Sequence, residues 1–599
     1  MMKLFKRLLA GVSALALCAG MTVSGFAGIP ACAVDDNNDD WIHAVGSRLY
    51  DKDGNEVWIT GANWFGFNCG ERFPHGLWSA DVDAMISTIA DHGINCLRLP
   101  IATELLMDWM NGVDDSEKVA GGINPKNTPD YSFNPELCRP DGSGMGSLEV
   151  FEVIMAKCKK YGVKVLVDVH SPALHNSGHN YNVWYYNSKA GDCDNMAVTE
   201  DGTQVTTEMW QDSLVWLADR YKNDDTLIAY DLKNEPHGKG QEGTAAAKWD
   251  GSTDENNWAY ASTQCALAML EKNPNALILI EGVEQYPKEG HTWGEPDSLT
   301  NPPYYPGWWG GQFRGVREYP IDLGKYQSQL VYSPHDYGPG VYNQTWFQKD
   351  FTTQSLLDDY WYDTWAFINA EDIAPLLIGE WGGFMDGAEN QKWMTLLRDY
   401  MIDNHINHTF WCINPNSGDT GGLLGYDWAT WDDEKYALFE PSLWQTSETG
   451  KYISLDHEHK LGSSGLTTAE YYKSYADSEG SNLDAGGKTD PIPTESNPPE
   501  ETTESKPEPS TSDVPDTSDD STEPGNTEIL WGDANVDGSV DISDVVLMNR
   551  VYVGIDEITD KGLTNADVDQ SGKIELSDSM NILKLLVHLL SESDFPISQ

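Results

Sequence analysis

Short, continuously apolar runs alternate with longer stretches of helical periodicity between residues 57 and 414. Eight runs are typical of buried strands, and they cover residues 57–63, 96–100, 163–170, 227–235, 276–281, 330–335, 376–380 and 409–414. Six stretches with apolar residues every three or four positions predict helices over 81–91, 148–161, 206–221, 257–271, 355–373 and 390–402. Apolar strands separated by helices indicate a parallel sheet. Eight such units, with no glycine-rich phosphate loop after the first strand, predict an α/β fold, a (β/α)8 TIM barrel, rather than an open doubly wound sheet.

The composition changes abruptly near residue 480. Residues 481–527 contain no aromatic residue and hold eight prolines among threonine, serine and glutamate. Such a segment buries too little apolar surface to fold, so it predicts an extended acidic linker. It separates a large domain over 36–480, with a barrel core over about 45–445, from a small domain over 528–599. The sequence suggests no role for residues 448–480, although a helix is expected near 467–476.

The first 33 residues have the three parts of a secretory signal peptide. Lys3, Lys6 and Arg7 precede an apolar run over 8–19, and Ala31-Cys32-Ala33 supplies an A-x-A cleavage site. The alternative is an uncleaved membrane anchor over 8–28. Because no later segment is long and apolar enough to span a bilayer, we expect a secreted, extracellular protein that is free of the membrane after cleavage.

The net charge excludes several classes of function. Thirty-eight basic residues against 95 acidic ones give a formal charge of −57. Nucleic-acid binding needs clustered Lys and Arg, so no nucleic-acid partner is expected. The same charge disfavours anionic membranes and acidic substrates. The 23 Trp and 27 Tyr, against 15 Phe, suit flat contacts with a neutral, hydroxyl-rich ligand.

Seven cysteines remain after the predicted cleavage: Cys69, Cys96, Cys138, Cys158, Cys193, Cys265 and Cys412. None forms a C-x-x-C pair, which disfavours a structural zinc site. An odd number leaves at least one free thiol, and the pairing of the others stays open. Cys96 and Cys412 lie in predicted strands and are expected to be core residues.

Polar side chains stand at the carboxyl ends of six predicted strands, where a packed core would place apolar ones. They are Arg98, His170, Asn234, Glu235, His335, Tyr337, Glu380 and Trp411. A barrel enzyme builds its site from these strand ends. A single strand-end glutamate is usually a helix cap or an ion-pair partner, but two of them in this company predict a site. Two opposed carboxyl groups are what cleavage of a glycosidic bond requires.

Several stretches of the predicted barrel resemble glycoside hydrolase family 5, and in particular its endoglucanases that act on cellulose. Leu232-Lys233-Asn234-Glu235-Pro236 carries the N-E-P signature of that family. Residues 62–66, 75–78, 93–100, 309–311, 335–337 and 414–422 resemble it in the same order. The tripeptide alone is common, whereas the ordered set is specific and covers essentially the whole barrel. The resemblance implies a retaining enzyme on a (β/α)8 barrel, with no cofactor for catalysis.

The resemblance also implies roles for the two glutamates and their neighbours. Glu235 would be the general acid/base and Glu380 the nucleophile, which agrees with the need for one protonated and one ionised carboxyl. Arg98 would keep Glu380 ionised, and Tyr337 would contact it. Asn234 would bind the sugar 2-hydroxyl.

Five further residues are assigned to the sugar or to the carboxyls by the resemblance. His170 and His335 would bind sugar or tune the carboxyls. Trp411 would stack under the sugar at the point of cleavage, with Trp78 and Trp309 further along the cleft. Some relatives have a second aromatic residue where Ile413 stands here. Core packing is the ordinary alternative for each tryptophan.

Two twelve-residue segments near the C-terminus, 533–544 and 567–578, repeat at a spacing of 34 residues and match the calcium loop of an EF-hand. Glycines at loop position 6 permit the sharp turn, and an apolar helix is predicted after each loop, over 545–551 and 580–589. Hard oxygen ligands select calcium, so two Ca²⁺ ions are expected. The predicted ligand positions are Asp533, Asn535, Asp537, Ser539, Asp541 and Asp544 in the first loop, and Asp567, Asp569, Ser571, Lys573, Glu575 and Asp578 in the second.

The C-terminal segment resembles the dockerin module, which binds cohesin domains of a cellulosome scaffold. Both loops place Asp at position 12, where ordinary EF-hands have Glu, and no clear helix enters the first loop. In that family the partner is recognised at loop positions 10 and 11, here 542–543 and 576–577. The cognate cohesin stays open. A calcium sensor is the disfavoured alternative, because sensor EF-hands have entering helices.

Together these patterns predict a secreted, scaffold-bound endo-β-1,4-glucanase that cleaves cellulose with retention of configuration, at a cell surface or in a cellulosome. The same mechanism on mannan, xyloglucan, mixed-linkage glucan or xylan is the nearest alternative. A carbohydrate-binding scaffold protein without activity is a more distant one, because both carboxyls and their supporting residues are present.

Overall fold

A computed structural model of the chain describes residues 39–123, 134–175, 181–189, 196–385, 387–483, 530–536, 540, 542–552, 558–568, 570–574, 576–586 and 595–596. The chain divides into two compact units, Met1–Glu495 and Ser496–Gln599. The predicted signal peptide and most of the predicted linker lie outside the described residues. The first linker residues, 481–483, contact the barrel, where Leu483 is buried.

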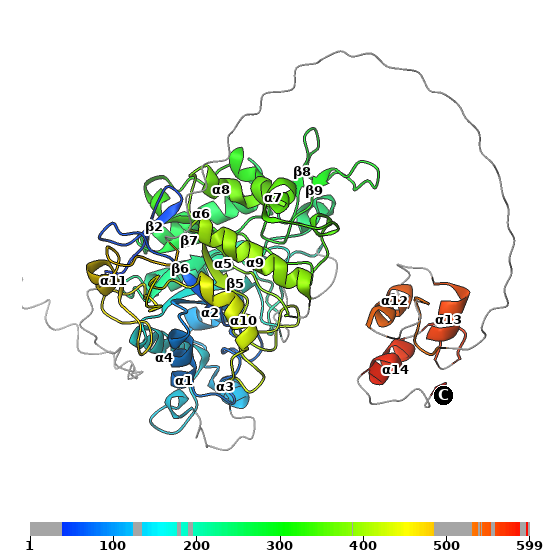
Figure 1. Ribbon diagram of the computed structural model, residues 1–599, viewed down its shortest axis with the longest axis horizontal. Helices are drawn as coiled ribbons and strands as arrows, with labels where there is room; N and C mark the ends of the chain where they lie inside the picture. Colours follow the sequence, from blue (N-terminus) through cyan, green and yellow to red (C-terminus); the bar gives the residue numbers. More distant parts are fainter. Residues whose placement is uncertain are drawn as a thin grey trace, which may run out of the picture. The chain divides into compact units, whose positions relative to one another are not determined.

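The large unit is a barrel of eight parallel strands, as the apolar runs predict (Figure 1). The strands are β3 (Thr60–Asn63), β4 (Cys96–Ala102), β5 (Lys164–Ser171), β6 (Leu227–Asp231), β7 (Leu277–Ile280), β10 (Leu330–Tyr332), β11 (Leu377–Ile378) and β12 (Asn407–Phe410). Neighbours in sequence pair with one another from β3 to β10, and β12 pairs with both β11 and β3. Parallel bridges from Tyr332 to Leu376 and from His335 to Glu380 close the ring.

Regular pairing stops before the end of five predicted strands, the fourth and the seventh among them. The fourth apolar run extends to Glu235, whereas β6 ends at Asp231. The seventh run covers 376–380, whereas β11 covers only Leu377–Ile378. At these ends the chain leaves the sheet, so the polar residues that follow can turn toward the barrel axis.

Helices surround the barrel, and all six predicted helices are present. They and the others of this unit are α1 (Val82–Asp91), α2 (Thr103–Asn111), α3 (Ser116–Ile123), α4 (Ser147–Lys160), α5 (Thr207–Arg220), α6 (Trp258–Leu270), α7 (Thr353–Leu356), α8 (Phe367–Ala370), α9 (Ala388–Asp403), α10 (Asp433–Phe439) and α11 (Thr468–Ser474). Side chains of Asp81, Thr206 and Asn257 cap α1, α5 and α6 by accepting backbone N–H bonds. The predicted helix over 355–373 is irregular, because a π-helical segment, η7 (Leu357–Ala366), joins α7 to α8.

Shorter elements lie between these. Two hairpins are formed by β1 (His43–Val45) with β2 (Arg48–Tyr50), and by β8 (Tyr286–Pro287) with β9 (Tyr304–Tyr305). The 3-10 turns are η1 (Pro135–Leu137), η3 (Gly240–Ala245), η4 (Arg314–Arg317), η5 (Gly324–Gln329), η6 (Thr345–Phe347) and η8 (Glu440–Ser442).

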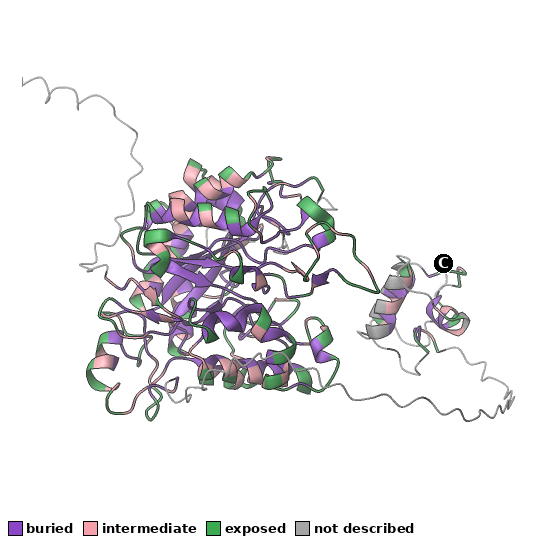
Figure 2. Cartoon of the chain, turned by 90° about the horizontal axis from the view of Figure 1, so that it is seen from above, coloured by how far each residue is buried: buried purple, intermediate pink, exposed green. Residues whose placement is uncertain are grey.

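The core lies inside the barrel and between its strands and helices, as the purple strands of Figure 2 show. Ten of the 23 tryptophans are less than 2% exposed, among them Trp64, Trp184 and Trp444. Much of the high tryptophan content therefore packs the core, and only the exposed or half-buried rings remain candidates for ligand contact.

Residues 448–480, for which the sequence suggests no role, pack against the amino-terminal end of the barrel. Ile453, Leu466 and Tyr471 share a buried cluster with Trp58 of the segment before β3. The expected helix near 467–476 is α11. Lys164 at the start of β5 is buried and forms ion pairs with Asp40 at 2.8 Å and Asp456 at 3.0 Å. This C-terminal extension therefore closes the end of the barrel opposite the strand-end polar residues.

The small unit contains α12 (Ile542–Tyr552), α13 (Asp560–Ala566) and α14 (Leu576–Leu586). Both predicted loop-following helices are present, whereas α13 has no counterpart in the prediction. Val545 and Met548 of α12 and Ile582 of α14 are buried in one apolar cluster. The unit therefore has a core of its own.

Two further predictions can be compared with the described residues. Six of the seven cysteines are free thiols, including the buried Cys96 and Cys412, and Cys193 lies outside the described residues. Within the described part of the chain, no helix has the length and apolarity needed to cross a bilayer.

Candidate active site

Glu235 follows β6 in a sharply bent segment. Its backbone has φ of +48°, in the left-handed region that a residue with a side chain rarely adopts. The peptide N–H of Glu235 donates to Glu281 Oε2 at 2.7 Å, and that of Asn234 donates to the Val169 carbonyl at 2.9 Å. These bonds turn both side chains toward the barrel axis, as strand-end placement predicts.

Glu380 follows β11 and lies opposite, where both of its oxygens accept strong hydrogen bonds. Arg98 Nη1 donates to Oε1 at 2.9 Å, and the Tyr337 hydroxyl donates to Oε2 at 2.7 Å. Glu380 is 4% exposed. A buried carboxylate with a guanidinium and a hydroxyl as donors is held in one orientation.

His335 lies between the two glutamates. Its Nδ1 is 3.0 Å from Glu235 Oε1 and 3.6 Å from Glu380 Oε2. One donor atom from each of Glu235, His335 and Glu380 lies within 4.8 Å of the others. Such a set has the residue types of a metal site, but Arg98 and Tyr337 already donate to both oxygens of Glu380. The short separation of the carboxyls suits direct attack on a bound sugar rather than attack by an intervening water.

The surroundings of Glu235 and Glu380 act differently on the pKa values of the two carboxyls. Burial and the neighbouring Glu380 charge raise the pKa of Glu235 well above 4.5. Burial also raises the pKa of Glu380, but there the Arg98 guanidinium and the Tyr337 hydrogen bond act in the opposite direction. Burial lowers the pKa of His335 well below 6.5, so this imidazole is neutral. The site therefore favours a protonated Glu235 beside an ionised Glu380.

Arg98 is fully buried and contacts most of the polar groups of the site. Besides Glu380, it donates to Asn63 Oδ1 at 2.9 Å, to Asp231 Oδ2 at 3.0 Å and to Asn234 Oδ1 at 3.1 Å. It also lies 3.2 Å from Asp168 Oδ1 and 3.4 Å from Glu281 Oε1. One guanidinium thus fixes groups that follow or belong to five different strands.

His170, at the end of β5, is fixed by Asp168. Its Nδ1 lies 2.7 Å from Asp168 Oδ2, and its Nε2 lies 3.4 Å from Asn234 Nδ2. Burial lowers the pKa of His170 to about 3, so it is neutral. Its ring stacks on Trp411, with centroids 5.6 Å apart and planes at 12°.

The three tryptophans that are predicted to contact sugar, Trp411, Trp309 and Trp78, lie in different surroundings. Trp411 is half-buried, its ring is nearly parallel to those of His170 and Phe65, and it donates its indole N–H to Ser417 Oγ at 3.1 Å. Trp309 is 43% exposed and stacks on His237 at 3.9 Å. Trp78 packs edge-on against Trp428 and near His75. Trp411 is thus connected to the residues around the carboxyls through His170. Trp78 instead contacts Trp428 and His75.

Five buried polar residues of the site escaped the sequence prediction. They are Asn63, Asp168, Asp231, Lys233 and Glu281. Burial raises the pKa of Asp168 to about 6 and that of Asp231 to about 7, and it lowers the pKa of Lys233 to about 8. Glu281 ends the fifth apolar run just as Glu235 and Glu380 end theirs, so the same strand-end signal identifies it.

The described residues of the two C-terminal loops fit a calcium ion. Asp544 and Asp578, at loop position 12, are fully buried and fold back over their loops. Asp544 Oδ1 accepts the Asn535 N–H at 3.0 Å, and Asp578 Oδ1 accepts the Val568 N–H at 3.0 Å. Asp567 accepts N–H bonds from Ser571 and Gly572, the turn at position 6. Asp533 is also buried, Lys573 is exposed, and Asp537, Ser539, Asp541, Asp569 and Glu575 lie outside the described residues.

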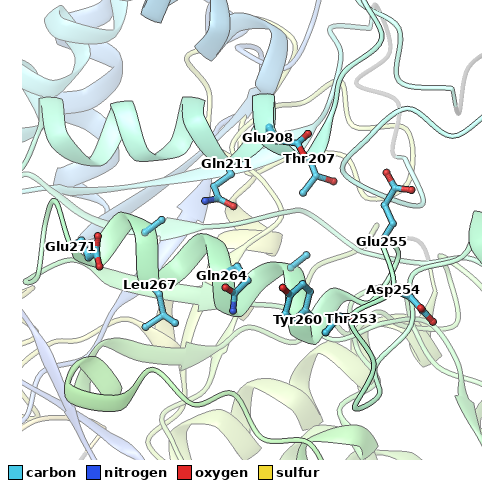
Figure 3. Close-up of a pocket in the computed structure, with 12 residues that line it drawn as sticks. Thr207, Glu208, Gln211, Thr253, Asp254, Glu255, Tyr260, Gln264, Leu267 and Glu271 are labelled. Atoms are coloured by element: carbon cyan, nitrogen blue, oxygen red, sulfur yellow. The ribbon is translucent and has the colours of Figure 1, made fainter.

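A separate groove of about 540 Å³ lies between α5 and α6 on the outside of the barrel (Figure 3). Gln211 of α5 and Tyr260 and Gln264 of α6 line it, together with several acidic side chains. It shares no residue with the site around Glu235 and Glu380.

Comparison with protein families and curated proteins gives matches over both units. A family model described as Cellulase (glycosyl hydrolase family 5) matches residues 50–417, and one described as Dockerin type I domain matches residues 531–586. Endoglucanase G of Acetivibrio thermocellus is 52% identical over 548 residues, which are 90% of this chain and 89% of that protein. Endoglucanase B of the same organism is 45% identical over 72% of this chain and 77% of that protein.

Solved structures match the large unit. An endocellulase from Pyrococcus horikoshii, in a complex with cellotetraose, is 29% identical with a TM-score of 0.53, over 67% of this chain and 98% of that one. The catalytic domain of the major endoglucanase from Xanthomonas campestris is 27% identical with a TM-score of 0.52, over 67% and 99% of the two chains.

Proposed function

The chain belongs to glycosyl hydrolase family 5, the cellulase family, with a C-terminal type I dockerin domain, and we propose that it is a secreted endo-β-1,4-glucanase that cleaves cellulose with retention of configuration. The observation that carries the mechanism is the pair Glu235 and Glu380, whose oxygens lie within 4.8 Å across His335. Retaining glycosidases place their carboxyls closer together than inverting ones, which need room for a water molecule.

In the first step, the ionised Glu380 attacks the anomeric carbon while Glu235 gives its proton to the departing glycosidic oxygen. A covalent glycosyl–Glu380 ester forms, and the C–O bond to the leaving sugar breaks. In the second step, Glu235, now ionised, takes a proton from water, and the water oxygen displaces Glu380. Two inversions at one carbon give net retention.

The neighbouring residues prepare these steps. Arg98 and Tyr337 hold Glu380 ionised and oriented through their hydrogen bonds. We assign Asn234 to the sugar 2-hydroxyl, where a hydrogen bond strengthens in the transition state. His170 and Trp411, stacked side by side, supply a polar edge and a flat face for the sugar at the cleavage point. Trp309 and Trp78 extend the contact along the glucan chain.

The polysaccharide is proposed from the relatives, because the catalytic pair alone serves several β-glycans. The endoglucanases named above support β-1,4-glucan, as does the cellotetraose bound by the Pyrococcus enzyme. Reducing-sugar release from carboxymethyl-cellulose, mixed-linkage glucan, xyloglucan, xylan and mannan tests this directly. We expect carboxymethyl-cellulose to be the best substrate, with a rapid fall in viscosity from internal cleavage. Faster hydrolysis of xylan or mannan would contradict the assignment.

The pH dependence follows from the opposite protonation states of the two carboxyls. Activity requires an ionised Glu380 and a protonated Glu235, so kcat/KM should be bell-shaped in pH. Because burial raises both pKa values, the acidic limb should lie above 4.5, and the basic limb, which reports Glu235, well above the acidic one.

Glu235→Ala should lose at least about 10³-fold of the activity on cellulose. It should retain the first step on an activated aryl cellobioside, whose leaving group needs little protonation. Equal losses on both substrates would contradict the acid role.

The remaining parts of the chain are assigned to export and attachment. We propose that residues 1–33 are a signal peptide and that residues near 481–527 form a linker to the dockerin over 528–599. The dockerin would bind a cohesin domain of a scaffold, with two Ca²⁺ ions held by the two loops. Calcium binding is supported by the buried Asp544 and Asp578 at loop position 12. A tethered enzyme acts repeatedly on substrate near its anchor.

A further inference from the structure

Glu281 is a fully buried carboxyl directly after β7 that the mechanism above leaves without a role. Its Oε2 accepts the N–H of Glu235 at 2.7 Å, and its Oε1 lies 3.2 Å from His335 Nε2. His335 Nδ1 in turn lies 3.0 Å from Glu235 Oε1. Glu281 therefore contacts Glu235 twice, once through the backbone and once through His335.

The surrounding backbone is shaped to cover this carboxyl. Gly310 has φ of +68°, and a Cβ at that position would lie 2.1 Å from Glu281 Oε2. Only glycine lets the chain approach so closely. The left-handed backbone of Glu235 is held from the other side by its N–H bond to Glu281. The strained geometry of the acid/base residue thus depends on Glu281.

His335 can pass on the protonation state of Glu281, because a neutral imidazole carries a single N–H. If Nε2 holds that hydrogen, Nδ1 faces Glu235 as an acceptor and draws the acid proton away from substrate. If Nδ1 holds it, Nδ1 donates to Glu235 Oε1. Among the described residues, His335 Nε2 is buried without a regular hydrogen-bond partner, and Glu281 Oε1 is the carboxyl oxygen beside it, at 3.2 Å.

We propose that Glu281 is a positioning residue for Glu235: as a neutral carboxylic acid it donates a hydrogen bond to His335 Nε2, so that His335 Nδ1–H points at Glu235 Oε1 and the acid proton of Glu235 is carried on its Oε2. This inference rests on the proposed role of Glu235 as acid/base. No proton is transferred in this arrangement during the reaction, because Glu281 and His335 only fix the direction of two hydrogen bonds.

The charges around Glu281 agree with a neutral acid. Asp231 from β6, Asp168 from β5 and Glu235 face it as carboxyls, and Arg98 from β4 is the cation within 3.4 Å. Lys233 is the second buried cation of this group. Burial, followed by Asp231, raises the pKa of Glu281 well above 4.5. Two cations beside five buried carboxyls, Glu380 included, favour protonation of some of them.

Glu281→Gln tests the proposal, because glutamine has the shape and the donor of a protonated glutamate. The Glu235 N–H requires an acceptor, so the amide oxygen faces it and the NH₂ group faces His335 Nε2, with loss of the long 3.4 Å hydrogen bond that Arg98 Nη2 donates to Glu281 Oε1. We expect kcat on carboxymethyl-cellulose within about threefold of the parent enzyme and an unmoved basic limb, since no charge is lost. Glu281→Met, which has a similar length but cannot form these bonds, should lower kcat about 100-fold while an activated aryl cellobioside keeps its first step.

Glu284→Met is the matched control. Glu284 is another buried carboxyl, three residues further on, and it accepts the N–H of Gly238 at 2.9 Å. Its replacement also removes a backbone hydrogen bond from the segment after β6, together with a hydrogen bond to Trp309. Because Glu284 is not part of the Glu281–His335–Glu235 contacts, the basic limb of this variant should not move, and the comparison is made on that limb rather than on KM. Thermal unfolding of all three variants by circular dichroism reports whether they fold.

An ionised Glu281 would give the opposite pattern, and it would overturn the proposal. Glu281→Gln would then remove a negative charge beside Glu235, shift the basic limb to lower pH and lower kcat as far as Glu281→Met does. Nitrogen-15 spectra of the whole protein, with the His335 signals assigned by their loss in His335→Gln, give a readout independent of activity. Protonated Nδ1 is expected, and protonated Nε2 would contradict it. Substantial activity of Glu235→Ala on cellulose would instead contradict the proposed function, whatever Glu281 does.

Discussion

Glu380→Ala is expected to lower kcat on carboxymethyl-cellulose by at least about 10⁴-fold while the barrel stays folded. In the proposed mechanism the variant removes the atom that forms the covalent intermediate, and the nearby carboxyls of Asp168, Asp231 and Glu281 are engaged with Arg98 and His335. It also leaves Arg98 with one carboxyl fewer, but Asp168 and Asp231 still pair with it. Steady-state hydrolysis and circular dichroism measure the two halves of this prediction.

A matched variant separates the nucleophile from its supports. Tyr337→Phe keeps both carboxyls and the ring, and removes only the hydrogen bond to Glu380 Oε2. It should cost far less than Glu380→Ala, on the order of 10-fold to 100-fold, because one charge-assisted hydrogen bond is lost. More than a few per cent of activity in Glu380→Ala would contradict its assignment.

Azide provides a further test of the same assignment. The small anion can enter the space left in Glu380→Ala, attack the anomeric carbon of an activated cellobioside and give a glycosyl azide of inverted configuration. In Glu235→Ala it should instead intercept the covalent intermediate and give the retained azide. The parent enzyme should release the β-anomer first, and an initial α-anomer would contradict the retaining mechanism.

The sequence predicts the barrel and the two glutamates because both depend on short-range patterns. Continuous apolar runs mark strands buried on both faces, and a carboxyl at the end of such a run has few structural uses. Glu281 carries the same signal at the end of the fifth run. Asp168, Asp231 and Lys233 lie within or close to strands, where the sequence alone gives no reason to expect buried charges. The placement of Asp168 and Asp231 depends on Arg98, which contacts groups from β3 to the segment after β11.

Contacts between segments that lie far apart in the sequence are the second feature that the sequence alone does not predict. Residues 448–480 close the amino-terminal end of the barrel through Asp456, which pairs with Lys164, and through His457, which contacts Asp40 across 417 residues of sequence. No periodic pattern in the sequence predicts such a contact. The irregular helix over 355–373 has a similar explanation, because the 3.6-residue period of the sequence predicts a helix but not its π-helical middle.

Removal of calcium is expected to unfold the dockerin while the barrel keeps its activity. Asp533, Asp544, Asp567 and Asp578 are buried in a small unit, and crowded carboxylates repel one another without a cation. The apolar faces of α12 and α14 pack together in one cluster, and we expect this packing to require that both loops are closed. With EGTA, hydrogen exchange of the full chain should lose protection over 542–552 and 576–586 by at least about 100-fold, with β3 to β12 unchanged.

The barrel should not respond, because its possible donor groups differ in kind. In the described residues each group of three or more possible metal donors includes a histidine, as in Asp51, Asp53 and His457. Calcium instead requires six to eight oxygen ligands. Hydrolysis of carboxymethyl-cellulose should therefore stay within about twofold on chelation, whereas binding to type I cohesin domains, measured with a panel of them, should be lost.

Asp544→Ala with Asp578→Ala should reproduce the effect of EGTA at saturating calcium, since each removes the residue that closes one loop over its start. Asp477→Ala, on the surface of the barrel unit, is the control for the loss of one acidic side chain and should leave both cohesin binding and exchange unchanged. Loss of barrel protection on chelation would place a calcium site in the catalytic unit. Cohesin binding that survives EGTA would show that the packing of α12 against α14 does not need the cation, and that the two loops do not fold by the mechanism their buried carboxylates imply.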